Sequence, residues 1–203
     1  MLLRYLRYYG FSGLLNFAIS FVKTKLFFPG AKIVRFPIDV RGKKKIQFSS
    51  GFTTGRYCRL ETLPFYSHEE RNEICLSFGI NVQINDFCHI TAMNRVVIGN
   101  NVLIASKVYI SDVSHGSYSN EIHSAPNIVP NSRELVSNPV NICDNVWVGD
   151  GVCVLPGVTI GVGSIIGANS VVTKDVPANV IAVGIPAVPI KYYNFEIKKW
   201  VKI

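Results

Sequence analysis

The sequence predicts an all-β fold in which the chain winds into a triangular prism. The first observation is a series of apolar or small residues spaced six apart: Val140, Val146, Val152, Val158, Ser164, Ser170 and Val176. The second is a further series two positions later: Ile142, Val148, Val154, Ile160, Ile166 and Val172. The third is an earlier copy of the pattern, interrupted by a slip of two residues near Met93: Phe78, Ile84, Ile90, Ile98, Ile104 and Ile110.

A six-residue period fits neither the 3.6-residue turn of an α-helix nor the two-residue alternation of a hairpin strand. It requires a backbone that returns an aliphatic side chain to the same inward position every six residues, as three short strands per coil do. Gly, Asn and Asp suit the corners because they tolerate turns with positive φ. About twelve such hexads make about four coils, more than the roughly three repeats that this architecture needs. We expect the prism to span residues 31–190 and residues 191–203 to form a C-terminal tail.

The composition is that of a packed domain. Hydrophobic residues make up 48% of the 203 residues and charged residues 17%, which excludes a disordered chain or a coiled coil. The five cysteines are odd in number and form no CxxC pair. This pattern favours free thiols in a reducing compartment over disulfides or a zinc site.

The N-terminal segment concentrates the positive charge. Residues 1–60 carry a net charge of +11, against −3 for the rest of the chain, and this asymmetry favours an anionic partner. Residues 1–30 are expected to form an amphipathic helical segment, since Leu3, Leu6, Gly10, Leu14, Phe17 and Phe21 recur at roughly helical spacing. The longest uncharged run, residues 8–22, is short for a membrane span, and no signal-peptide cleavage site follows it. Two interpretations stay open: a helix that lies on a membrane surface, and a helix that packs on its own domain.

One long interruption of the repeat is the candidate functional segment. Residues 112–139 are expected to leave the prism as an excursion loop, and long loops on rigid scaffolds often carry function. His115 lies at its start, and an imidazole is suited to removing a proton near neutral pH. Asp112 either accepts a hydrogen bond from the His115 ring or is an exposed loop carboxylate.

The repeat tract of residues 140–187 resembles the hexapeptide-repeat acyltransferases, in particular the galactoside and maltose O-acetyltransferases. Over almost the whole chain the sequence is closer to bacterial lipopolysaccharide O-antigen and capsule O-acetyltransferases. The segments that carry this match are VRFP, GFTTG, NVQINDFCHI, LIASKVYISDVSHG and NSRELVSNPV. The resemblance implies a left-handed parallel β-helix, acetyl-CoA as donor, a glycan acceptor, and a homotrimer with a cleft between adjacent prisms.

The resemblance also implies roles for individual residues. His115 would be the general base, and Asn85 would lie beside the reacting acetyl group and the acceptor. Trp147 would line the pocket, and the backbone N–H of Asp150, where relatives often have serine, would support the oxyanion. Contacts to the pantetheine arm and to the nucleotide phosphates are implied for four residues: Ala168, Thr173 and Lys174 on the arm, and Lys191 near the phosphates. Val188 stands where a second basic residue is common.

We therefore expect transfer of an acetyl group from acetyl-CoA to a sugar hydroxyl of a surface polysaccharide, whether O-antigen, capsule or lipid-linked precursor. Direct transfer is expected, because no nucleophile elbow is present. We expect no metal, since three histidines converging on zinc are not indicated, and no nucleic-acid partner. The expected location is cytoplasmic, with peripheral association at the inner face of the membrane. The alternatives are an N-acetyltransferase acting on an amino sugar nucleotide and a non-catalytic β-helix binding scaffold.

Overall fold

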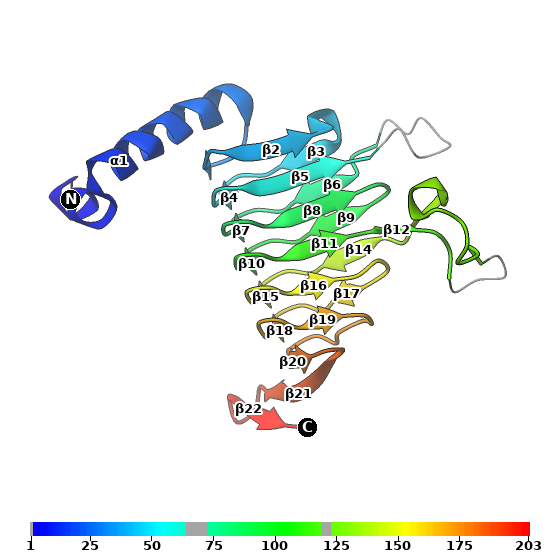
Figure 1. Cartoon of the computed structure of the whole chain (residues 1–203). Helices are drawn as coiled ribbons and strands as arrows, with labels where there is room; N and C mark the ends of the chain where they lie inside the picture. The colour runs from blue at the N-terminus through cyan, green and yellow to red at the C-terminus, as the bar shows by residue number, and fades with distance from the viewer. Residues whose placement is uncertain (1, 64–72, 119–122) are drawn as a thin grey trace.

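The computed structural model describes residues 2–63, 73–118 and 123–203. One helix, α1 (Leu2–Phe27), precedes a parallel β-helix of short strands arranged in three sheets (Figure 1). Sheet A has the order β1 (Ile33–Val34), β4 (Thr53–Thr54), β7 (Gln83–Ile84), β10 (Leu103–Ile104), β15 (Trp147–Val148), β18 (Ile165–Ile166), β20 (Val180–Gly184), β21 (Ala187–Asn194) and β22 (Lys199–Lys202).

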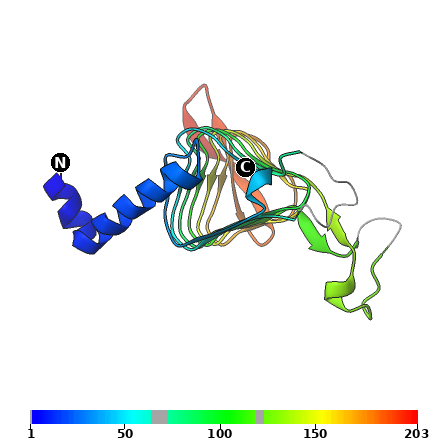
Figure 2. The same ribbon diagram turned by 90° about the horizontal axis from the view of Figure 1, so that it is seen from above.

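The other two sheets complete the prism. Sheet B runs through β2 (Ile38–Arg41), β5 (Cys58–Thr62), β8 (His89–Ala92), β11 (Tyr109–Ser111), β16 (Cys153–Val154) and β19 (Val171–Val172). Sheet C runs through β3 (Ile46–Phe48), β6 (Leu76–Phe78), β9 (Val96–Ile98), β14 (Val140–Ile142) and β17 (Thr159–Ile160). Each coil passes from C to A to B, so the prism has three corners: the C–A, A–B and B–C edges (Figure 2).

Both predicted series of the repeat point inward, as expected. Val146, Val152 and Val158 are each 1% exposed or less, and Ile142, Ile160 and Ile166 are fully buried. Burying a valine or isoleucine side chain contributes about 1.5–3 kcal/mol. The ladder of aliphatic side chains therefore holds each coil against the next.

The corners confirm part of the prediction about positive φ. At the C–A edge Asn81, Asn101 and Asn145 all have positive φ, and their side-chain amides are linked by hydrogen bonds of 3.3 Å. At the A–B edge, however, Tyr57 and Phe87 also adopt positive φ, and their exposed rings stack with centroids 5.0 Å apart. Bulky residues are uncommon in this conformation, so the sequence did not indicate them.

Helix α1 meets the prism through small polar residues. Thr24 is fully buried, and its hydroxyl donates to the carbonyl of Ser20 (2.6 Å) and accepts from the N–H of Val34 (2.8 Å). The predicted N-terminal helix is present but is kinked at Gly10, whose φ is 66°, and Phe17 and Phe21 of the predicted apolar series stay exposed. Beyond this contact the helix projects from one side of the prism, and the excursion projects from another (Figures 1 and 2). No helix among the described residues has the length and apolar character needed to cross a membrane.

The C-terminal segment differs from the tail that was expected. β21 crosses the predicted boundary at residue 190 and pairs antiparallel with both β20 and β22, which adds a hairpin to sheet A. The six-residue rhythm ends before this segment, and Tyr193 and Trp200 pack across the hairpin with ring centroids 5.2 Å apart. Alternation within a two-stranded ribbon, rather than the hexad, orders these residues.

Candidate active site

His115 is held at the end of a short β-ribbon. The excursion begins with β12 (Val113–His115), which pairs antiparallel with β13 (Leu135–Ser137) and places His115 opposite Leu135. The excursion is therefore a loop that is closed at its base by a two-stranded β-ribbon. A 3-10 turn, η3 (Pro130–Ser132), lies shortly before β13 in the sequence. The imidazole is exposed, and none of the described side chains hydrogen-bonds to the ring. In a single chain the His115 side chain therefore lies at the end of the ribbon and is free to contact a substrate.

Asp112 anchors the root of this ribbon. Its side chain is fully buried, so it is neither an exposed carboxylate nor a partner of the His115 ring. Its two oxygens accept hydrogen bonds from the backbone N–H groups of Met93, Asn94 and Arg95, at 2.7–2.8 Å, and from the Ser137 hydroxyl, at 3.1 Å. Residues 93–95 include the two-residue slip in the repeat. The slip is thus a widened B–C corner that the Asp112 carboxylate fills.

Arg133 fastens the outer part of the excursion. Its guanidinium donates to the carbonyls of Ile128 and Pro126 and, at 2.7 Å, to the hydroxyl of Tyr118. That hydroxyl in turn donates to the carbonyl of His115. Arg133 therefore stabilises the backbone at His115 and does not point to an acceptor from this position.

A second group of predicted residues lies at the A–B edge. Asn85 follows β7, Asp150 follows β15 and Ala168 follows β18, each where the chain turns from sheet A into sheet B. The Asp150 carboxylate accepts a hydrogen bond from the Ser106 N–H (2.9 Å), which explains an acid at this position. None of the described backbone carbonyls accepts from the Asp150 N–H, so this donor remains available for a substrate oxygen.

Trp147 and Lys191 lie on the outer face of sheet A. Trp147 is 49% exposed and is in register with Ile165 of the next strand. This row of residues paired across neighbouring strands continues through β20 to Lys191 of β21 and then to Lys202 of β22. Like charges directly opposite one another destabilise a sheet, so this lysine pair suits an anion. Lys202 was not predicted as a site residue, because its only signal in the sequence is the alternation of a hairpin beyond the repeat.

The remaining predicted residues share the edge of His115 instead. Thr173 and Lys174 follow β19 at the B–C edge, where β11 gives way to the excursion. Sheet B separates this edge from the A–B edge, and about five extended residues per side give roughly 15 Å between them. A single chain therefore does not bring His115 together with Asn85.

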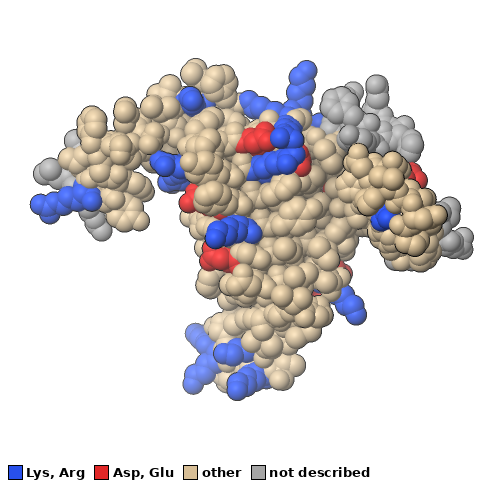
Figure 3. All heavy atoms as spheres, in the orientation of Figure 1, with Lys and Arg blue, Asp and Glu red and all other residues tan. Residues whose placement is uncertain are grey.

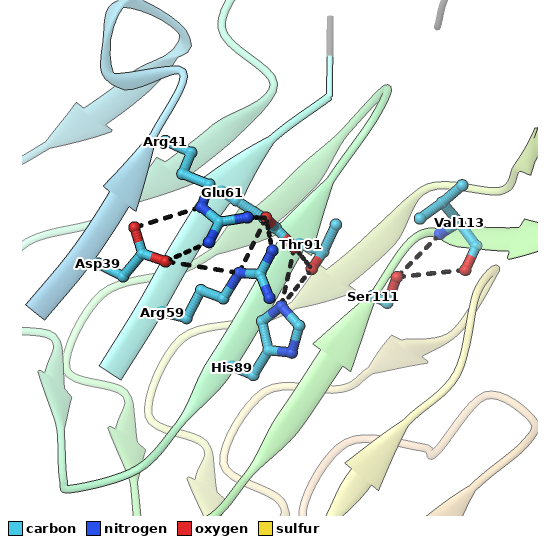
Figure 4. A network of polar contacts seen from close by, with 8 residues as sticks. All are labelled: Asp39, Arg41, Arg59, Glu61, His89, Thr91, Ser111 and Val113. Atoms are coloured by element: carbon cyan, nitrogen blue, oxygen red, sulfur yellow. Dashed lines mark hydrogen bonds and ion pairs between the residues drawn. The ribbon is translucent and has the colours of Figure 1, made fainter. Parts of the chain in front are cut away.

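An ionic network covers the face of sheet B between the two edges (Figure 4). Glu61 is 6% exposed, and its carboxylate bonds to Arg59 (2.7 Å), His89 (2.9 Å) and Thr91 (3.0 Å). Burial would raise the pKa of Glu61, but these hydrogen bonds outweigh it, and the pKa lies below its usual value. His89 is thus held on the face of sheet B by the Glu61 carboxylate.

Comparison with known proteins identifies the family. A family described as bacterial transferase hexapeptide (six repeats) matches residues 139–174. The putative lipopolysaccharide biosynthesis O-acetyl transferase WbbJ of Escherichia coli (strain K12) is 40% identical over 203 residues, 100% of both chains. The chain belongs to the hexapeptide-repeat acyltransferase family. The galactoside O-acetyltransferase of the same strain is 34% identical over 164 residues, which are 81% of this chain and 75% of that protein.

Solved structures agree on the fold of this hexapeptide-repeat acyltransferase. A variant of AntD, an N-acyltransferase from Bacillus cereus in complex with dTDP-4-amino-4,6-dideoxyglucose and coenzyme A, matches with a TM-score of 0.67. The two share 18% identity, and the match covers 86% of this chain and 91% of that one. The predicted all-β, left-handed parallel β-helix with an N-terminal helix is confirmed. Within residues 2–63, 73–118 and 123–203 of this acyltransferase, no group of three or more His, Cys, Asp or Glu residues is placed to hold a metal ion.

Proposed function

We propose that the chain transfers an acetyl group from acetyl-CoA to a sugar hydroxyl of a bacterial surface polysaccharide or its precursor. The observation that carries this proposal is the position of His115 at the B–C edge, at the end of an anchored β-ribbon. The anchored ribbon holds the backbone at His115, and no described side chain hydrogen-bonds to the imidazole. The relatives named above supply the reaction class, and the residues matched to donor and acceptor lie on the same prism.

In this proposal His115 moves one proton. A ring nitrogen takes it from the acceptor hydroxyl as that oxygen attacks the thioester carbonyl, and the same nitrogen returns it to the leaving thiolate. The free N–H of Asp150 donates to the carbonyl oxygen as negative charge develops there. Acetyl-CoA supplies the activated acyl group. Thr173 and Lys174 would contact its pantetheine arm, with Ala168 opposite, while Lys191 and Lys202 would bind the nucleotide phosphates.

We further propose that the working site forms between two copies of the chain, in a homotrimer. His115, Thr173 and Lys174 lie on one edge of sheet B, and Asn85 and Asp150 lie on the other. A site that needs both sets is incomplete in one copy. If the B–C edge of one prism meets the A–B edge of its neighbour, the two halves face each other, and closed three-fold symmetry repeats this contact three times.

The outward face of α1 supports association with a lipid surface. Positions 11, 15, 19, 22 and 26 fall within about 80° of one helix face, and all are exposed: Phe11, Leu15, Ile19, Val22 and Leu26. Ser20 and Thr24, which contact the prism, lie on the opposite face. Lysines and arginines occur along α1 and around the first coils (Figure 3). An apolar stripe next to basic residues is typical of helices that bind anionic membrane surfaces.

Polar substitution of this stripe is expected to abolish membrane binding. Replacing Phe11, Leu15, Val22 and Leu26 by serine should remove sedimentation with vesicles containing an anionic phospholipid, because the buried apolar area is lost. None of the four lines the cavity of about 670 Å³ between α1 and the A–B edge, so transfer to a water-soluble acceptor should persist. As a control, serine at Ile80 and Val162, exposed at the prism corners, should leave sedimentation unchanged. Equal sedimentation of the stripe variant and the native protein would contradict the membrane proposal.

The acceptor class is tested on the glycan itself. Mass spectrometry of surface polysaccharide from cells with and without this protein should show the loss of one acetyl group per repeating unit, labile to mild base, when it is absent. Restoring the native chain should restore the acetyl group, and restoring the His115→Asn variant should not. A polysaccharide with unchanged mass in all strains would contradict the proposed function.

A further inference from the structure

A cavity of about 670 Å³ lies between α1 and the A–B edge. Tyr8, Tyr9 and Asn16 line it from the helix, and Asn85 lines it from the prism. This volume falls within the roughly 300–1,000 Å³ of typical ligand pockets. Because Asn85 is matched to the reacting acetyl group and acceptor, the cavity opens at the point where the acceptor hydroxyl would react.

Two arginines line this cavity without a carboxylate partner. Arg35 and Arg56 are both partly buried, and neither forms a salt bridge among the described residues. The guanidinium of Arg35 donates to the carbonyl of Thr54 (3.0 Å), which orients it without neutralising it. Asp86, the one acid among the described residues that line the cavity, accepts a hydrogen bond from the backbone N–H of Arg56.

Other arginines of the same coils are paired. Arg41 contacts Asp39 at 2.7 Å, and Arg59 contacts Glu61 at 2.7 Å, both on the face of sheet B. The cavity arginines differ in that no carboxylate among the described residues lies within ion-pair distance of their guanidinium groups. An anionic ligand would supply the missing counter-ion, and the planar guanidinium fork matches phosphate oxygens.

We infer that the acceptor is a sugar linked to a phosphate or diphosphate, which Arg35 and Arg56 bind while Asn85 faces the reacting hydroxyl. This inference rests on the proposed function and adds the chemical class of its acceptor. A nucleoside diphosphate sugar and a polyprenyl diphosphate sugar both carry the group. None of the apolar stripe residues of α1 lines the cavity, so either ligand can enter without displacing them.

The test compares one sugar in three forms: methyl glycoside, nucleoside diphosphate sugar and polyprenyl diphosphate sugar. The native protein should use at least one phosphorylated form with kcat/KM about tenfold or more above that of the methyl glycoside. Arg35→Gln and Arg56→Gln should each raise KM for that form by about ten- to a hundredfold, the effect of losing a charge-assisted hydrogen bond. Both variants should leave kcat/KM for the methyl glycoside unchanged. Whichever phosphorylated form is preferred identifies the source of the phosphate.

Controls separate this inference from the proposed function. Lys32→Gln removes the same charge from an exposed side chain outside the cavity and should change none of these constants. Binding of inorganic pyrophosphate, measured by calorimetry with coenzyme A at saturation, should weaken about tenfold in each arginine variant whether or not any sugar is acetylated. Equal use of all three sugar forms, or pyrophosphate binding unaffected by both substitutions, would overturn the inference and leave the acetyl transfer itself standing. Absence of transfer to every sugar would instead contradict the proposed function.

Discussion

Replacing His115 by asparagine is expected to lower kcat for acetyl transfer by about 10²–10⁴, the usual contribution of a general base. Asparagine keeps a polar side chain of similar reach but cannot accept a proton from a hydroxyl. The KM for acetyl-CoA should change by less than about threefold, because the expected loss is confined to the transition state. Initial rates with a sugar acceptor, at several acetyl-CoA concentrations, give both constants.

A neighbouring histidine provides the matched control. His123 lies in the same excursion and is exposed, and no contact with another described residue places it at the prism edge. His123→Asn should therefore retain native kcat. Thermal unfolding of both variants should match that of the native protein, since neither ring is buried. Native kcat in the His115→Asn variant would rule out this histidine as the base.

The repeat could be predicted from the sequence because one physical rule governs it. Residues such as Val152 and Ile160 point inward at every sixth position, and asparagines such as Asn101 and Asn145 occupy corners that require positive φ. The excursion was predicted because the six-residue spacing of inward side chains is interrupted over residues 112–139. His115 was predicted because it lies where the rule fails and because the family resemblance implies a general base there.

Other features depend on contacts between distant segments, which periodicity does not encode. Asp112 was assigned to the histidine or to solvent, yet it binds three N–H groups of a corner 17–19 residues earlier. The two-residue slip and the acid were each visible alone. Only the stacking of one coil on the next shows that they form a single feature, which fixes the direction in which the β-ribbon leaves the prism.

The N-terminal helix and the C-terminal hairpin illustrate the same limit. Helical spacing identified α1, but the residues that contact the prism are Ser20 and Thr24, because their hydroxyls reach the first coil. The pairing of Lys191 with Lys202 depends on a turn outside the repeat. Likewise, the sequence indicates Arg35 and Arg56 only as two of the many basic residues in the N-terminal part of the chain. The structure shows that both line one cavity.

The division of the site between two edges predicts that two inactive variants restore each other. His115→Asn retains the A–B edge, and Asn85→Ala retains the B–C edge. If each site takes Asn85 from one copy and His115 from the next, random trimers formed from equal amounts of the two variants contain native sites at about a quarter of positions. Each variant alone contains none. Mixing the separately assembled variants, without exchange of subunits, should restore nothing.

The measurement is kcat per chain of the whole trimer population, co-expressed in equal amounts and purified through one tag that all chains carry. The companion sample contains native chains co-assembled with the double variant His115→Asn, Asn85→Ala. In this sample a site shared between two copies keeps about a quarter of native activity, whereas a site within one chain keeps about half. We expect the two complementary variants, co-assembled, to regain activity close to a quarter of native. Co-assembled variants that stay as inactive as their parents, with the companion sample at half, would show that a single chain builds the whole site and would contradict the account.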